Sequence, residues 1–119
     1  MLPSDVAIYV ALEPIDLRWS FDILAGTVRE RLGGDPKSGA LFLFFGRRRD
    51  RVKVLFYDRT GYCLLYKRLD RGTFHLPDVV EPGAATVAID EDELALLLEG
   101  VDLPRERASR AKRPRGRVH

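Results

Sequence analysis

The residues with the clearest chemical potential are arginines and lysines gathered in the middle of the chain. Three adjacent arginines are followed at short intervals by further cations, and together they are Arg47, Arg48, Arg49, Arg51, Lys53, Lys67, Arg68 and Arg71. Guanidinium groups bind phosphate through paired hydrogen bonds, so such a cluster is typical of a nucleic-acid contact. Three adjacent like charges on a turn also repel one another, so we expect them to have a partner. That partner is either DNA or an acidic protein surface, and the acidic residues 77–104 of this same chain are one such surface.

Aromatic residues are interleaved with these cations along the same segment. They are Phe56, Tyr57, Tyr62, Tyr66 and Phe74. An aromatic face can stack on a nucleic-acid base, but the aromatic side chains of a half-buried sheet more often fill the core. We therefore expect most of these rings to be buried, with the cations on the solvent side of the sheet.

Charge is strongly segregated along the 119 residues, although the formal net charge is only +2. Residues 46–76 carry nine basic and three acidic groups, whereas residues 77–104 carry eight acidic groups and no basic group. Residues 105–119 carry seven basic groups and one acidic group. This last segment has no apolar periodicity, so we predict a single domain over residues 1–104 followed by a disordered basic tail over residues 105–119.

Patterns typical of enzymes and metal sites are missing from the sequence. Cys63 and His75 lie on segments that would be neighbours, but no third residue is placed to orient the pair. The acidic run at residues 90–93 is better explained as the first turn of a helix than as a cation site. No phosphate-binding glycine loop is visible. We therefore expect no catalytic residue, metal, cofactor or small-molecule substrate.

Cysteine content and hydropathy indicate where the protein resides. A single cysteine rules out an intramolecular disulfide and fits a reducing cytoplasm. The first residues do not resemble a signal peptide, and no apolar run is long enough to cross a membrane. We therefore expect a cytoplasmic protein without a membrane partner.

Apolar patterning predicts the strands and turns that must position the cations. Alternation over residues 6–12 predicts a first strand, and helical spacing over residues 21–32 predicts a helix that ends at Gly33. Short turns then separate four predicted strands, at residues 41–45, 52–57, 62–69 and 73–76. Turns this short require antiparallel hairpins. A strand at residues 86–89 precedes a helix whose start has a capping-box pattern, with Asp90 followed three residues later by Glu93.

This order of elements predicts an α+β fold in which two helices pack on one face of a mostly antiparallel, meandering sheet. We expect one core, and its members are Phe42, Phe44, Val54, Leu64, Leu94 and Leu98. The buried face of the second helix is expected to comprise Leu94, Leu97, Leu98 and Val101.

Two stretches of the sequence resemble a known family. Residues 41–61 read LFLFFGRRRDRVKVLFYDRTG, and residues 66–74 read YKRLDRGTF. Both are similar to the small TnpB accessory protein of insertion sequences of the "sixty-six" family, which is unrelated to the RNA-guided nuclease of the same name. The resemblance covers residues 4–103 and excludes the tail. The chain departs from the family pattern at Trp19, Arg59 and Leu76, where Lys, Gly and Trp are usual.

The resemblance implies a supporting role in bacterial DNA transposition, without catalysis. It also implies two protein partners, the transposase and a second small accessory protein encoded by the same element. Together with the basic cluster, it favours an accessory factor that binds DNA through the eight cations named above. The alternative is an adaptor that docks onto the transposase and makes no direct contact with DNA.

Overall fold

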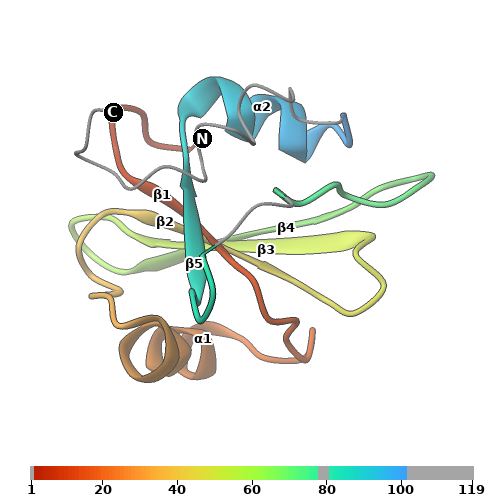
Figure 1. Ribbon diagram of the computed structural model, residues 1–119. Helices are drawn as coiled ribbons and strands as arrows, with labels where there is room; N and C mark the ends of the chain where they lie inside the picture. Colours follow the sequence, from red (N-terminus) through yellow and green to blue (C-terminus); the bar gives the residue numbers. More distant parts are fainter. Residues whose placement is uncertain (1, 78–80, 102–119) are drawn as a thin grey trace.

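Five strands form one sheet in the computed structural model, which describes residues 2–77 and 81–101 (Figure 1). The elements in chain order are β1 (Ile8–Ala11), α1 (Phe21–Thr27), the π-helical turn η1 (Val28–Leu32), β2 (Leu41–Phe45), β3 (Arg51–Tyr57), β4 (Tyr62–Arg68), β5 (Thr86–Ile89) and α2 (Glu91–Leu98). No helix within the described ranges is both long and apolar enough to cross a bilayer. The predicted basic tail at residues 105–119 lies outside the described residues.

The strands are arranged in the order β4-β3-β2-β1-β5, and three of the four neighbouring pairs are antiparallel. The exception is the pair β1 and β2, which runs parallel. Parallel neighbours cannot be joined by a tight turn, and here α1 and η1 supply the crossover. The mixed, mostly antiparallel sheet with two helices confirms the predicted α+β class.

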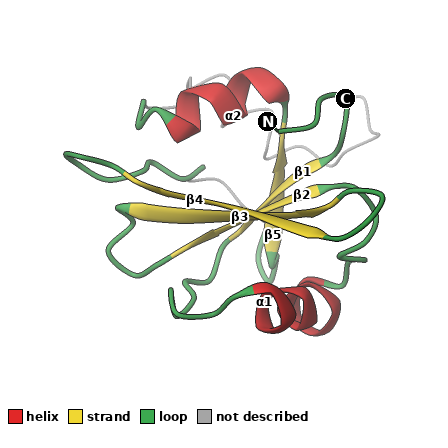
Figure 2. Cartoon of the chain, turned by 180° about the vertical axis from the view of Figure 1, so that it is seen from behind, coloured by secondary structure: helices red, strands yellow, loops and turns green. Residues whose placement is uncertain are grey.

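The two helices cover opposite faces of the sheet, so the prediction that both pack on one face is wrong (Figures 1 and 2). Leu24 of α1 belongs to one apolar cluster, and Leu97 of α2 belongs to the other. The physical reason lies in β2, where all five residues are apolar and buried. Successive side chains of a strand point to opposite faces, so both faces of β2 need a cover.

The core is accordingly divided in two by the sheet, and the prediction of one core is also wrong. Phe42 and Phe44 pack on the α1 side, whereas Val54 and Leu94 pack on the α2 side. Two of the predicted core residues, Leu64 and Leu98, are only half-buried. Val101 is 43% exposed because the chain turns at Gly100, whose φ of 80° lies in the left-handed region.

The start of α2 confirms the predicted capping box. The backbone N–H of Glu93 donates to the Asp90 carboxylate, and the backbone N–H of Asp90 donates to the Glu93 carboxylate, both at 2.8 Å. Each side chain thereby satisfies a backbone donor that has no partner within the helix.

The predicted strand at residues 73–76 is not formed, and an irregular segment takes its place. Its backbone is joined to the turn between β2 and β3 by the N–H of Phe74, which donates to the carbonyl oxygen of Arg49 at 2.6 Å. The buried Phe74 ring packs edge-on against Phe45, with ring centroids 5.5 Å apart. The apolar signal at this position therefore marks a single core anchor instead of a strand.

Candidate nucleic-acid interface

Six arginines lie together at one end of the sheet, which we name the arginine end. They are Arg47, Arg48, Arg49, Arg51, Arg68 and Arg71. The turn between β2 and β3 supplies the first three, and the loop that follows β4 supplies the last. In Figure 1 this turn and this loop project from the same side of the molecule. Arg51 begins β3 directly opposite Arg68, the last residue of β4.

Backbone hydrogen bonds hold the two arginine-bearing segments side by side. Within the turn, the N–H of Arg49 donates to the carbonyl oxygen of Gly46 at 3.0 Å, and Arg49 has a left-handed φ of 59°. The N–H of Leu69 then donates to the carbonyl oxygen of Asp50 at 2.9 Å. Together with the bond from Phe74 to Arg49, this contact fixes the loop at residues 69–73 beside the turn at residues 46–50.

The positive charge of the arginine end is accessible. Five of the six arginines are exposed, and Arg51 is half-buried. None of the six forms an ion pair with a carboxylate within the described part of the chain. Residues 46–51 and 68–73, which hold all six arginines, contain only two acidic residues, Asp50 and Asp70, so the arginines outnumber them three to one. A polyanion can therefore approach these guanidinium groups without first displacing an ion-pair partner.

Lys53, one of the eight predicted contact residues, is instead buried within the protein. Its side chain is only 6% exposed, and its ammonium donates to the carbonyl oxygens of Leu17 and Trp19, both at 2.6 Å. The same ammonium lies 4.8 Å from the ring centroid of Tyr66. Lys53 therefore anchors the loop between β1 and α1 to the sheet, and in this position it cannot reach a phosphate.

Lys67, also among the predicted contacts, binds the C-terminal end of α2. Its ammonium donates to the carbonyl oxygen of Leu98 at 2.7 Å. A cation at a helix C-terminus satisfies a carbonyl without an intrahelical partner and favours the negative end of the helix dipole. Lys67 therefore joins β4 to α2, and we leave both lysines out of the candidate interface.

Arg18 lies beside the arginine end, although no sequence pattern indicated that it would. The preceding residue, Leu17, is held by Lys53 and packs so closely that a Cβ on Gly46 would lie 2.6 Å from its side chain. Arg18 forms a bidentate ion pair with Asp16, with Nη2 2.6 Å from Oδ2. Hydrogen bonds from the Arg18 side chain and backbone lower the pKa of Asp16 to about 2. The sequence signal that could have placed this loop is Lys53, the one lysine of the otherwise apolar centre of β3, because a buried ammonium needs backbone acceptors such as the carbonyl of Leu17.

The aromatic residues divide largely as the core interpretation expects. Phe56 and Phe74 are buried on the α2 side of the sheet. Tyr57 and Tyr62 are half-buried and pack edge-to-face, with ring centroids 5.1 Å apart. Tyr66 differs from the others, because 52% of it is exposed.

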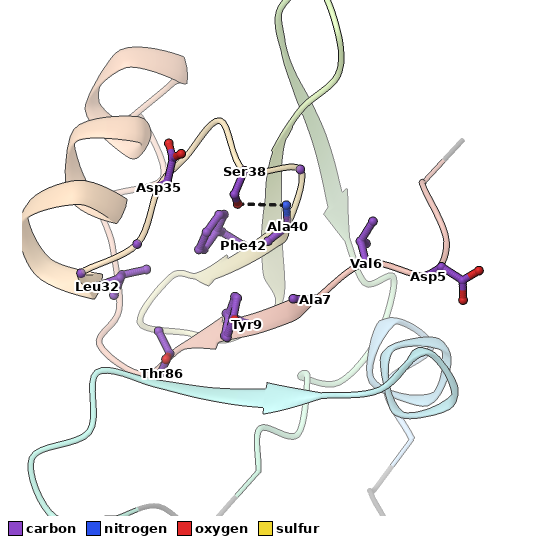
Figure 3. A pocket seen from close by; sticks show the side chains of 13 residues that line it. Asp5, Val6, Ala7, Tyr9, Leu32, Asp35, Ser38, Ala40, Phe42 and Thr86 are labelled. Carbon is purple, nitrogen blue, oxygen red and sulfur yellow. Dashed lines mark hydrogen bonds between the residues drawn. The ribbon is translucent and has the colours of Figure 1, made fainter. Parts of the chain in front are cut away.

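A hollow of about 560 Å³ lies at the opposite end of the sheet (Figure 3). Its apolar wall includes the rings of Tyr9 and Phe42, which stack with their centroids 5.6 Å apart. Among the described residues that line it, the charged ones are Asp5 and Asp35, and none is basic. This described lining is therefore unsuited to phosphate, and it includes no histidine or cysteine.

Cys63 is held in a form unsuited to nucleophilic attack. Its thiol donates to the Asp58 carboxylate at 3.5 Å. Burial, and secondly this hydrogen bond, raise the pKa of Cys63 above its ordinary value. The backbone N–H groups of Thr60 and Gly61 lower the pKa of Asp58. Among residues 2–77 and 81–101, no three histidine, cysteine, aspartate or glutamate side chains gather to hold a metal ion.

Comparison with known proteins identifies the family. Residues 6–108 match the family of IS66 Orf2-like proteins. The chain belongs to this family. It is 43% identical over 104 residues to "Uncharacterized protein y4hO" of Sinorhizobium fredii (strain NBRC 101917 / NGR234), covering 86% of this chain and 88% of that relative. It is 33% identical over 107 residues to "Uncharacterized protein y4jC" of the same strain, covering 90% and 89%. No solved structure matches the chain.

Membership in the IS66 Orf2-like family confirms the resemblance inferred from residues 41–61 and 66–74. It makes the chain an accessory protein of IS66-type insertion sequences, with a role associated with transposition.

Proposed function

We propose that this IS66 Orf2-like protein is a non-catalytic accessory factor that binds DNA through the arginine end. The observation that carries the proposal is the concentration there of six arginines, none of them paired with a carboxylate in the described part of the chain. Guanidinium groups are suited to phosphate because they present several donors in a fixed plane. Phosphate contacts also position a protein on DNA without a sequence requirement.

The arrangement of the arginines supports binding along a DNA backbone. Three of them lie on one turn, and the others come from two strand ends and a neighbouring loop, so the charges spread over several segments. Long-range backbone hydrogen bonds fix these segments relative to one another. Six cations on segments whose backbones are fixed in this way can neutralise about four to six phosphates.

The salt dependence of DNA affinity tests the proposal. Neutralising about four to six phosphates gives a slope of log affinity against log salt of about −4 to −5. Titration of a labelled duplex, followed by fluorescence anisotropy, should therefore show affinity falling by roughly 10²- to 10³-fold between about 50 and 200 mM salt. A full-length protein with no salt-sensitive binding at the lower concentration would contradict DNA binding.

Two triple variants show whether the arginine end carries the binding. Changing Arg47, Arg48 and Arg49 to Ala should make the slope shallower by about 0.9 for each phosphate that the variant no longer neutralises. The matched control removes three exposed cations elsewhere, Arg29, Arg31 and Arg59, and should leave the slope nearly unchanged. If the first variant instead fails to co-purify with the element-encoded transposase, and the intact protein does not bind DNA, the basic cluster is a protein-docking surface.

A further inference from the structure

Tyr66 is an exposed aromatic residue located among the arginines. It lies on β4, the outermost strand on its side of the sheet, and 52% of it is exposed. The other two tyrosines of the hairpin, Tyr57 and Tyr62, pack against each other and are half-buried. Core packing therefore does not explain the position of Tyr66.

The Tyr66 ring is held in place from two directions. Lys53 lies opposite it on β3 and places an ammonium over the ring, 4.8 Å from the centroid. That ammonium is itself fixed by two carbonyl oxygens at 2.6 Å. Arg51 donates from Nη1 to the Tyr66 hydroxyl at 3.4 Å. One face of the Tyr66 ring is thus covered by a fixed cation. The solvent-exposed part of the ring is therefore its opposite face.

Arg51 and Arg68 flank this ring on the same face of the sheet. Arg51 lies two residues before Lys53, and Arg68 lies two residues after Tyr66, so strand alternation directs all four side chains to one side. The two arginines are also directly opposite each other. The sheet therefore presents a fixed aromatic face with two guanidinium groups beside it.

We infer that Tyr66 is a stacking platform for an unpaired DNA base, with Arg51 and Arg68 binding the adjacent phosphates. The inference rests on the proposed DNA-binding function and specifies its ligand class as single-stranded or locally unpaired DNA. Every base offers a flat face to an aromatic ring, so stacking does not need a particular sequence. The bases of an intact duplex are stacked on one another, and the Tyr66 ring can reach only an unpaired one.

Binding of two DNA forms by two Tyr66 variants tests this inference. Tyr66→Ala should weaken binding of a short single-stranded oligonucleotide by about 5- to 150-fold, the range expected for removal of one base–aromatic stack. Tyr66→Phe keeps the ring and should bind within about 2-fold of the original protein. Duplex binding should be equal in all three proteins, because the phosphate contacts are unchanged. A thermal unfolding curve for each variant verifies that the fold is retained.

Oligonucleotides with abasic sites separate stacking from phosphate binding. An oligonucleotide with consecutive abasic positions keeps every phosphate but offers no base at those positions. The original protein should bind it more weakly than the intact strand, by the same factor as Tyr66→Ala, and Tyr66→Ala should not distinguish the two probes. Tyr57→Leu alters a tyrosine at the other end of the same hairpin and should behave like the original protein.

Three outcomes would contradict the stacking inference, and the binding data distinguish them. If salt-sensitive duplex binding is present but Tyr66→Ala binds single strands normally, the stacking inference is wrong and the proposed function stands. If Tyr66→Ala weakens duplex and single-strand binding equally, the ring makes a general contact and the preference for unpaired DNA is wrong. If the intact protein binds neither form of DNA, both the proposed function and this inference fail.

Discussion

Lys53 is a buried residue that holds the loop next to the arginine end in place, although its charge suggested a contact with DNA. It is 6% exposed, and its ammonium binds the carbonyl oxygens of Leu17 and Trp19. A buried ammonium is tolerated when its donors are satisfied, and here two carbonyls and an aromatic face surround it. The loop between β1 and α1 thereby stays against the sheet, which keeps Arg18 beside the other arginines.

The first prediction at this scale concerns that internal contact. Lys53→Met fills a similar volume but leaves both carbonyl oxygens without their donor, so the free energy of unfolding should fall by about 1–3 kcal/mol. Urea denaturation measures the change. Arg68→Met, on the exposed surface of the neighbouring strand, is the control and should change stability by less than about 0.5 kcal/mol. Equal stability of the two variants would show that Lys53 does not anchor the loop.

Cys63 provides a second prediction at the residue scale. The negative charge of Asp58 contributes to its raised pKa, after burial. Asp58→Asn removes the charge but keeps the side-chain oxygen that accepts from the N–H groups of Thr60 and Gly61. The pKa of Cys63 should therefore fall, and more thiolate should be present at a given pH. Alkylation by iodoacetamide, measured against pH, should become faster near neutral pH, whereas Asp70→Asn should have no effect.

At the scale of the element, α2 depends on its first turn. Only eight residues form this helix, and a helix so short is not stable in isolation. Its capping box satisfies two backbone donors, while Leu94 and Leu97 bury its apolar side against the sheet. Lys67 binds the last turn from β4, so both ends of α2 are fixed by side chains.

Removing the cap should therefore weaken the whole fold. Asp90→Ala leaves the N–H of Glu93 without its acceptor and should lower the free energy of unfolding by about 0.5–2 kcal/mol. Asp92→Ala, in the same turn but without a capping bond, should cost less, about 0.5 kcal/mol, through the helix dipole alone. Thermal unfolding of the two variants gives the comparison. A smaller decrease for Asp90→Ala than for Asp92→Ala would show that charge, and not capping, stabilises this end.

Local patterns in the sequence predicted the elements better than their arrangement. The capping box and the glycine at the end of the first helix depend on neighbouring residues, so both were visible in the sequence. The side of the sheet that each helix covers depends on long-range packing. The apolar sequence of β2 indicated that both faces of the sheet are buried at this strand, but not which helix covers which face. The predicted strand at residues 73–76 was wrong because its apolar signal came from one aromatic residue, Phe74, whose ring is buried and whose N–H donates to the turn at Arg49.

In the candidate site, too, the residues adjacent in sequence were predictable, and those brought together by long-range contacts were not. The cluster Arg47, Arg48 and Arg49 was evident from the sequence because the three residues are adjacent. The loop containing Arg71 joins them only through backbone hydrogen bonds between distant segments. Charge alone could not distinguish a solvent-exposed arginine from Lys53 and Lys67, whose ammonium groups satisfy internal carbonyls.

At the scale of the whole molecule, the charges lie at different ends of the sheet. The arginine end includes the turn between β2 and β3, whereas Asp5 and Asp35 line the hollow at the opposite end. The six residue steps along β3 separate these ends by roughly 20 Å, at about 3.3 Å per residue. That distance exceeds two Debye lengths at physiological salt, where each is about 8 Å. The net charge of +2 therefore does not describe the electrostatic potential at either end.

The final prediction uses this separation to distinguish local phosphate contacts from the average charge of the protein. The double variant Asp5→Asn with Asp35→Asn raises the net charge by two units far from the arginine end, and Asn at position 35 can still accept the hydrogen bond from the backbone N–H of Lys37. Its salt slope for duplex binding should equal that of the original protein, because the slope counts the phosphates contacted. Its affinity at low salt should rise by no more than a few-fold, through long-range attraction. Changing Arg47, Arg48 and Arg49 to Ala lowers the net charge by three units but should also make the slope shallower. Anisotropy titrations at several salt concentrations measure both quantities, and equal slopes in all three proteins would show that DNA responds to net charge instead of the arginine end.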